Sequence, residues 1–287
     1  MKNFKIKSFC KINLTLNVLK KLDNGYHAIA SLVTFCDLHD DISIRKINEL
    51  RDKITFSGKF KKGINKKSNT ITKLLYLLRR RNFFNKQNFK INIKKNIPHG
   101  SGLGGGSSNA ASLLNFFNIK MDLGLSKKRT YEIARQIGFD TPINLIKKNT
   151  FIDGKKNRLI RFNNKIGLNL LIIYPNIICS TKKMYKKNKI FSYKKNKIKF
   201  KIKKNEKLIN YLINENNDLQ EVVIKYYPKI KKIINYIKSQ NGCSSARITG
   251  SGSACFGIFS SKKNAINAHK MIKTKYPKYW SATSKTI

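Results

Sequence analysis

Acidic residues are scarce in this chain, which carries 14 Asp and Glu against 61 Lys and Arg, a formal net charge of +47. A chain this basic suggests nucleic-acid binding. The lysines, however, are spread along the whole sequence among Asn and Ile, and no RNA- or DNA-binding motif accompanies them. We therefore favour compositional drift at tolerant surface positions and expect no specific nucleic-acid partner. Incidental binding to polyanions stays open, because attraction to phosphates needs no motif.

Long apolar runs and paired cysteines are also missing. No stretch of 18 or more apolar residues occurs, so we expect no membrane span. The first residues, Met1 to Lys5, lack the apolar region of a signal peptide, and we expect a cytoplasmic protein. The five cysteines are scattered without a C-x-x-C pair and the four histidines are isolated, so neither a disulfide framework nor a zinc site is indicated. With 40% hydrophobic residues, the chain has the means to build one large or two medium domains.

Glycine is concentrated in one place, because five of the 16 glycines fall between Gly100 and Gly106. Residues 98–111 read Pro-His-Gly-Ser-Gly-Leu-Gly-Gly-Gly-Ser-Ser-Asn-Ala-Ala, after a strand-like alternation and before a helix-like segment. Glycine allows positive φ and a close approach of the backbone to a ligand. A helix N-terminus presents unpaired N–H groups and the positive end of the helix dipole. Together these features predict an anion site, most often one for phosphate.

Two common phosphate-binding loops do not explain this run. A P-loop needs a lysine after its glycines, and none follows here. Gly100, Gly102 and Gly105 match the dinucleotide fingerprint G-x-G-x-x-G, which requires an acidic residue about 20 positions further on. Asp122 is near that distance, but its neighbours are typical of a loop between helices. The two serines after the glycines are better explained as ligands for phosphate oxygens and Mg²⁺.

Hydrophobic periodicity predicts strands and helices interleaved in both halves of the chain, which indicates an α+β fold. The predicted strands are residues 9–18, 41–45, 53–57, 89–94, 168–174, 246–249, 255–259 and a last one after residue 280. The predicted helices are residues 69–81, 107–117, 127–137, 219–238 with a break at Pro228, and 261–276. The lysine-rich residues 182–204 have little periodicity and favour a loop or a variable insertion.

Four segments resemble one known family, the GHMP kinases. The loop from Pro98 matches that family's ATP loop, Pro-x-x-x-Gly-Leu-Gly-x-x-Ser-Ser-x-Ala. The other three segments are Lys11-Ile12-Asn13-Leu14, Asp23-Asn24-Gly25-Tyr26-His27 and Arg247-Ile248-Thr249-Gly250-Ser251-Gly252-Ser253-Ala254-Cys255-Phe256. They occur in family order, span nearly the whole chain, and look most like the branch that phosphorylates 4-diphosphocytidyl-2-C-methyl-D-erythritol.

The resemblance implies a two-lobed α+β fold with the active site in the cleft between the lobes. The N-terminal α/β lobe, with the ATP loop, would span residues 1–155, and the C-terminal α+β lobe residues 156–287. The resemblance also implies ATP and Mg²⁺ as cofactors and transfer of a phosphoryl group to the 2-hydroxyl of the substrate, in non-mevalonate isoprenoid precursor biosynthesis. We expect a monomer or a weak homodimer.

Two residues are implied to be catalytic. Asp140 stands before Thr-Pro, where the sequence alone favours a helix N-cap. In the resemblance, Gly138-x-Asp140-x-Pro142 matches the segment that holds the family's catalytic base, and a capped turn would also keep that carboxylate rigid. Lys11 precedes an apolar strand, which suggests partial burial, and the resemblance assigns it to stabilising the developing alkoxide.

Further residues are implied to bind the substrate and the nucleotide. Tyr26 and His27 look like the cytosine clamp, Asn13 is placed on the substrate hydroxyls, and Thr181 on the substrate side of the site. Ser107 is also the predicted metal ligand. The predicted nucleotide-binding residues are Asn69, Lys95, Pro98, His99, Gly100, Ser101, Gly102, Leu103, Gly104, Gly105, Gly106, Ser107 and Ser108.

Two alternatives remain open from the sequence. One is another GHMP small-molecule kinase, such as homoserine or mevalonate kinase, although those lack the Tyr-His turn and the Gly-Gly-Gly-Ser-Ser run. The other is a basic nucleic-acid-binding protein on a degenerate kinase scaffold. The presence of every key position argues against degeneracy.

Overall fold

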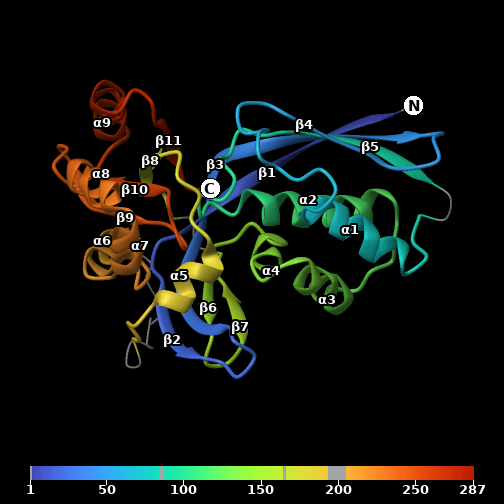
Figure 1. Cartoon of the computed structure of the whole chain (residues 1–287), viewed down its shortest axis with the longest axis horizontal. Coiled ribbons are helices and arrows are strands. Elements are labelled where there is room, and N and C mark those ends of the chain that lie inside the picture. Colours follow the sequence, from blue (N-terminus) through green and yellow to red (C-terminus); the bar gives the residue numbers. More distant parts are fainter. Residues whose placement is uncertain (1, 85–86, 164–165, 193–204) are drawn as a thin grey trace. The chain divides into compact units, whose positions relative to one another are not determined.

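The computed structural model describes residues 2–84, 87–163, 166–192 and 205–287, and its elements are labelled in Figure 1. The chain divides into two compact units, each made of separate segments. Unit 1 consists of Met1–Lys11, Leu38–His99 and Gly104–Lys147, and unit 2 of Ile12–Asp37, Gly100–Leu103 and Lys148–Ile287. Strands β1 (Asn3–Asn13) and β3 (His27–Ile47) contribute residues to both units. The predicted lobe boundary at residue 155 is a different division of the chain and stays a prediction.

Unit 1 is a sheet with helices packed on one face (Figure 1). Strand β5 (Asn88–Lys94) pairs antiparallel with the second half of β3 and parallel with β4 (Lys53–Ser57). Alternate strand residues point at the helices, as the period of two requires. The helices are α1 (Thr70–Arg79), α2 (Gly105–Lys120), α3 (Lys127–Ile137) and the single turn α4 (Thr141–Asn144). The shared core includes Ile44, Leu78, Ile91, Leu114 and Phe117.

Unit 2 contains the part of the seven-stranded sheet that is built on the first half of β3, and a second, four-stranded antiparallel sheet. In the first, β3 pairs with β2 (Asn17–Lys21) and β6 (Thr150–Asp153), and β6 pairs with β7 (Arg158–Arg161). The second, in the order β11-β8-β10-β9, is formed by β8 (Asn169–Tyr174), β9 (Cys243–Ile248), β10 (Cys255–Phe259) and β11 (Trp280–Lys285). The helices are α5 (Thr181–Lys187), α6 (Asn205–Ile213), α7 (Gln220–Tyr226), α8 (Pro228–Lys238) and α9 (Lys262–Lys275).

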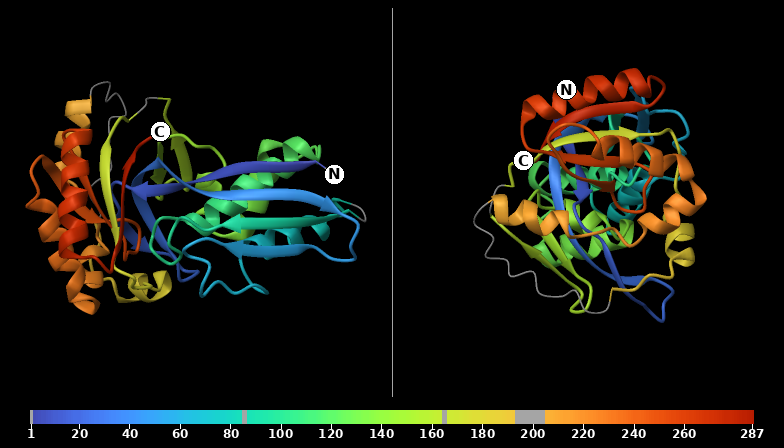
Figure 2. Two further views of the ribbon diagram at one scale, coloured as in Figure 1. Left: turned by 90° about the horizontal axis from the view of Figure 1, so that it is seen from above. Right: turned by 90° about the vertical axis from the view of Figure 1, so that its left-hand side faces the viewer.

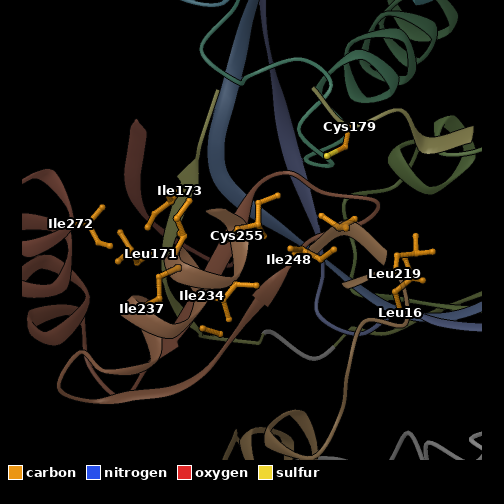
Figure 3. Packing of buried hydrophobic residues seen from close by; sticks show 14 of the residues in the cluster. Leu16, Leu171, Ile173, Cys179, Leu219, Ile234, Ile237, Ile248, Cys255 and Ile272 are labelled. Carbon is orange, nitrogen blue, oxygen red and sulfur yellow. The ribbon is translucent and has the colours of Figure 1, made fainter. Parts of the chain in front are cut away.

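The second sheet of unit 2 buries one face against α8 and α9. Ile234 and Ile237 of α8 and Ile272 of α9 lie in the same apolar cluster as Leu171 and Ile173 of β8 (Figure 3). Figure 2 shows α9, in red, beside the strands it covers. This core fixes the β9–β10 hairpin, which carries the turn predicted as the third family motif.

The predicted α+β fold is confirmed, and several boundaries are corrected. Helices α7 and α8 are separated at Pro228, as expected. The predicted strand 9–18 is interrupted after Asn13, because the Thr15 hydroxyl accepts the N–H of Leu32 at 3.0 Å in place of a backbone carbonyl. Residues 182–187 are helical, as part of α5, and not a loop.

The described residues include only part of the predicted insertion and no helix suited to span a membrane. Of the predicted insertion 182–204, residues 193–204 lie outside the described part of the chain. Within the described residues, no helix combines the length and the apolar character that crossing a membrane would require.

Candidate active site

The first turn of α2 has the geometry of an anion site. Gly104 is the N-cap residue in the left-handed conformation (φ 70°) and contributes no side-chain cap. The first intrahelical bond runs from the N–H of Ser108 to the carbonyl of Gly104 at 2.9 Å. The preceding N–H groups, of Gly105, Gly106 and Ser107, therefore have no intrahelical acceptor and add to the positive end of the helix dipole. The helix begins two residues earlier than predicted, so these glycines belong to the helix itself.

The two serines of this turn differ in their surroundings. Ser108 is buried, and its hydroxyl donates to the carbonyl of Phe9 at 2.6 Å and accepts from the hydroxyl of Ser8 at 2.9 Å. Ser107 is only half-buried, and among the described residues its hydroxyl has no protein partner. Ser108 thus anchors the helix to β1, and Ser107 is the serine available to a ligand.

Lys11 and Asp140 lie together beside this turn. The Lys11 Nζ is 3.4 Å from the Asp140 Oδ2. The lysine side chain is 4% exposed and the carboxylate 45% exposed, so the pair has one buried and one open member. A Cβ built on Gly104 would lie 2.8 Å from the Lys11 Cγ, which means that the lysine stem runs directly along the start of α2. Unit 1 therefore brings the predicted base, the predicted lysine and the helix N-terminus together.

Asp140 occupies the N-cap position of α4 without acting as its cap. Its side chain makes no cap hydrogen bond, and its backbone is in the right-handed helical region. Instead, the backbone carbonyl of Asp140 accepts a hydrogen bond from the Asn144 Nδ2 at 2.6 Å, which stabilises the short helix. The capping interpretation that the sequence favours is therefore wrong for the side chain, and the carboxylate is left for Lys11 and a ligand.

Other residues of unit 1 with a predicted nucleotide role make internal contacts. Asn69 caps α1 by accepting the N–H groups of Ile71 and Thr72 in a capping box. Lys95 is buried and pairs with Asp40, so its ammonium is not presented to solvent. The His99 Nε2 lies 2.8 Å from the carbonyl of Lys62. A nucleotide role for these residues, and for Pro98, stays a prediction.

Within unit 2, residues 100–103 pack closely on the turn after β9. A Cβ on Gly102 would lie 2.2 Å from the carbonyl oxygen of Thr249, so only glycine fits there at its φ of +84°. The carbonyl of Ser101 accepts the N–H of Ala254 at 2.9 Å, and Leu103 is fully buried. These contacts hold the predicted loop and the predicted third motif against each other.

The predicted substrate residues belong to unit 2. The Asn13 Nδ2 donates to the Ser31 hydroxyl at 2.8 Å, and the Thr181 and Ser251 hydroxyls lie 2.8 Å apart. Tyr26 is 51% exposed. It ends a turn in which its backbone N–H donates to the Asn24 side chain.

The ring of His27 forms part of an aromatic cluster. It lies 5.2 Å from the ring of Tyr185 and 6.4 Å, in a stacked arrangement, from the ring of Phe191. Burial lowers the pKa of His27, and the nearby Lys21 lowers it further, which favours the neutral imidazole. A neutral imidazole beside flat rings is suited to a nucleobase, because it donates at one nitrogen and accepts at the other.

Metal-binding capacity is limited. Among the described residues, no group of three or more His, Cys, Asp or Glu could hold a metal ion. Mg²⁺ keeps several waters and is usually held by one or two carboxylates together with substrate phosphates, so a site for it would use few protein ligands.

The sequence did not assign a role to Asp40 or Thr70, which both contact the site. The Thr70 hydroxyl donates to the carbonyl of Gly106 at 2.9 Å, and Asp40 binds the segment before the loop. An acidic residue inside a strand-like segment is the signal that would have found Asp40, because buried charges need specific partners.

Known proteins are similar to this chain over its whole length. The family model of the GHMP kinases N terminal domain matches residues 69–145, and that of the GHMP kinases C terminal matches residues 201–278. A 4-diphosphocytidyl-2-C-methyl-D-erythritol kinase from Pelagibacter ubique is 41% identical over 289 residues, covering 100% of both chains. One from Caldicellulosiruptor bescii is 35% identical over 272 residues, covering 94% of each.

Solved structures share the fold. A 4-(cytidine 5'-diphospho)-2C-methyl-D-erythritol kinase superposes with a TM-score of 0.78 at 21% identity, covering 98% of this chain and 99% of the other. A homoserine kinase from Cytophaga hutchinsonii superposes with a TM-score of 0.71 at 14% identity, covering 100% and 95%. At such identities the structural likeness establishes the fold alone.

Proposed function

We propose that this chain transfers the γ-phosphoryl group of ATP to the 2-hydroxyl of 4-diphosphocytidyl-2-C-methyl-D-erythritol. The premise is that the chain belongs to the 4-diphosphocytidyl-2-C-methyl-D-erythritol kinase family of the GHMP kinases. The step would belong to isoprenoid precursor biosynthesis, with the cytoplasm as the predicted compartment. The observation that carries the proposal is the Lys11–Asp140 pair beside the open N-terminus of α2.

The start of α2 is the proposed phosphate site. Its unpaired N–H groups and dipole favour negatively charged oxygens, and no acidic residue stands in its first turn. Gly106 is exposed, and a Cβ there would meet nothing closer than the Thr70 side chain at 3.6 Å. Phosphate oxygens therefore have room to reach the backbone.

Asp140 is the proposed general base. It accepts the proton of the acceptor hydroxyl as that oxygen attacks the γ-phosphorus, the bond from the γ-phosphorus to the β–γ bridging oxygen breaks, and ADP leaves. The Lys11 ammonium beside the carboxylate offsets the negative charge that develops on the attacking oxygen. Most of the acceleration would come from positioning and charge stabilisation, as is general for phosphoryl transfer.

Mg²⁺, when bound, would offset the charge of the β- and γ-phosphates, with Ser107 as the residue of this chain proposed to hold it. We expect Ser107→Ala to raise the Mg²⁺ concentration needed for half-maximal turnover without changing the unfolding midpoint. Ser108→Ala should instead destabilise the protein by about 1–3 kcal/mol, because it leaves buried partners unsatisfied. A magnesium titration and thermal unfolding of both variants check this; a raised Mg²⁺ requirement in Ser108→Ala but not in Ser107→Ala would contradict it.

Tyr26 and His27 are the proposed recognition site for the cytidine group. The exposed ring of Tyr26 offers a stacking surface, worth about 1–3 kcal/mol per base. We therefore expect Tyr26→Ala to raise KM for the cytidylyl substrate by about tenfold or more and KM for ATP by much less. The exposed Tyr76 on α1 provides a control, since Tyr76→Ala should change neither constant. Equal effects of Tyr26→Ala on both substrates would remove Tyr26 from the recognition site.

A substrate panel tests the proposed function itself. The purified chain, with Mg²⁺ and ATP, is offered 4-diphosphocytidyl-2-C-methyl-D-erythritol, mevalonate and homoserine, and ADP release is followed. We expect turnover with the first compound alone. Turnover with mevalonate or homoserine in its place would reassign the chain to another branch, and RNA binding at physiological salt without any turnover would favour a degenerate scaffold.

A further inference from the structure

Asp40 is a buried carboxylate that the proposed mechanism does not use. It lies in β3, is 0% exposed, and binds the three residues that follow β5. Its Oδ1 accepts the N–H groups of Asn96 at 2.8 Å and of Ile97 at 2.9 Å, and its Oδ2 accepts the Lys95 ammonium. Hydrogen bonds to an ionised carboxylate are stronger than neutral ones, so this side chain fixes the whole segment.

The Asn96 side chain adds a second connection between the same two segments. Its Nδ2 donates to the carbonyl of His39 at 3.0 Å and to the Asp41 Oδ2 at 3.1 Å. His39 and Asp41, the neighbours of Asp40, thus also form hydrogen bonds with the segment 95–97. These bonds extend the contact between β3 and this segment beyond the last ladder pair of β3 and β5, Asp41 with Lys94.

The segment held by Asp40 supports the first helical residue of α2. A Cβ built on Gly105 would lie 3.2 Å from the Ile97 Cγ2 and 3.3 Å from the Lys95 Nζ. The Gly105 backbone therefore lies close to both side chains, and a Cβ there would fit only if they moved by a few tenths of an ångström. The ammonium also adds positive charge at the positive end of the α2 dipole, while burial lowers the pKa of Lys95 and Asp40 opposes that shift.

We propose that Asp40 is a positioning residue for the phosphate site: by holding Lys95, Asn96 and Ile97 beneath Gly105, it sets the place of the first N–H groups of α2. The proposal rests on the proposed function of that helix N-terminus. Asp40 touches no substrate and acts through the residues it binds. A displacement of about 1 Å at reacting groups is enough to cost around 10²-fold in rate, so a fixed platform has a functional consequence.

The test compares Asp40→Asn with a matched control, Asp52→Asn. Asp52 also lies in unit 1, pairs with Arg79 and accepts a backbone N–H, that of Phe89 at 2.8 Å, but it has no contact with the loop. Both substitutions remove a charge that binds a cation and a backbone N–H. The dissociation constant of a non-hydrolysable ATP analogue and KM for the cytidylyl substrate are measured well below the lowest unfolding midpoint.

We expect Asp40→Asn to weaken binding of the ATP analogue by about tenfold or more with KM for the cytidylyl substrate changed less than about twofold, and Asp52→Asn to change neither. Equal affinity in Asp40→Asn and wild type, or equal losses in both variants, would overturn the proposal. If Asp40→Asn does not fold, Asn96→Ala takes its place, with a loss of about threefold expected from the weaker connection.

Hydrogen exchange separates this proposal from the proposed function. Amides of residues 95–108 should exchange faster in Asp40→Asn than in Asp52→Asn whether or not the chain turns over ATP. Unchanged exchange there would overturn the positioning role, even in an active enzyme. A wild-type chain that binds no ATP analogue, with exchange responding as expected, would instead count against the function assigned to the site.

Discussion

Replacing Asp140 by Asn is expected to lower kcat by about 10²-fold or more while affinity for ATP and for the cytidylyl substrate stays close to that of the wild type. The amide has nearly the shape of the carboxylate and keeps an oxygen 3.4 Å or so from the Lys11 ammonium, so the fold and the lysine should be retained. It cannot accept the hydroxyl proton, and only the chemical step loses its base. Steady-state kinetics with both substrates varied, and burst or single-turnover measurements, separate this step from binding.

Asp122→Asn is the matched control for that variant. Asp122 is an exposed acidic residue of the same unit with a φ of +48°, a conformation that Asn adopts readily. It removes the same charge from an already basic chain and should leave kcat unchanged. Near-normal turnover in Asp140→Asn, or a comparable loss in Asp122→Asn, would remove Asp140 from the mechanism.

Gly104→Ala is expected to reduce kcat by about 10²-fold, with only a modest loss of stability. The new methyl group would lie 2.8 Å from the Lys11 Cγ and 2.9 Å from its Cε, so the lysine stem has to move. That movement takes the ammonium away from Asp140 and from the attacking oxygen. The positive φ of 70° adds strain of about 1–2 kcal/mol in any residue with a Cβ.

Gly124→Ala separates strain from displacement. Gly124 has a φ of +61°, and a Cβ there would meet no atom within 4 Å. The two variants should therefore show similar decreases in the unfolding midpoint, and only Gly104→Ala should lose activity. If both keep full activity, the contact between the loop and Lys11 does not set the position of the ammonium.

Local signals predicted much of the fold and of the site. The glycine run predicted the start of a helix with a proposed phosphate site, and Gly104, Gly105 and Gly106 do form the start of α2. Pro228 predicted the break between α7 and α8, because proline lacks the N–H that a helix interior needs. Such features depend on neighbouring residues and can be recognised without tertiary contacts.

Features that depend on distant residues were missed. Strand β3 spans His27–Ile47, but only residues 41–45 were predicted, because much of its first half is buried on both faces and shows no alternation. The sequence did not assign a role to Asp40. Its partners lie 55 to 57 positions away, so only the folded chain shows that it is buried and bound.

The sequence also could not show that Ser107 and Ser108 have different surroundings. Both serines fit a helix N-terminus, and both were assigned to the nucleotide. The two serines differ because the Ser108 hydroxyl is hydrogen-bonded to the Ser8 hydroxyl and to the carbonyl of Phe9, which lie in β1 near the start of the chain. The sequence also could not show that the Asp140 side chain makes no cap hydrogen bond and lies 3.4 Å from the Lys11 ammonium instead.

A crystal structure of the chain with Mg²⁺ and a non-hydrolysable ATP analogue tests the central claim most directly. We predict γ- or β-phosphate oxygens about 2.7–3.2 Å from the N–H groups of Gly105, Gly106 or Ser107, with Lys11 and Asp140 beside the terminal phosphate. Triphosphate density elsewhere, with those N–H groups facing only water, would contradict the account.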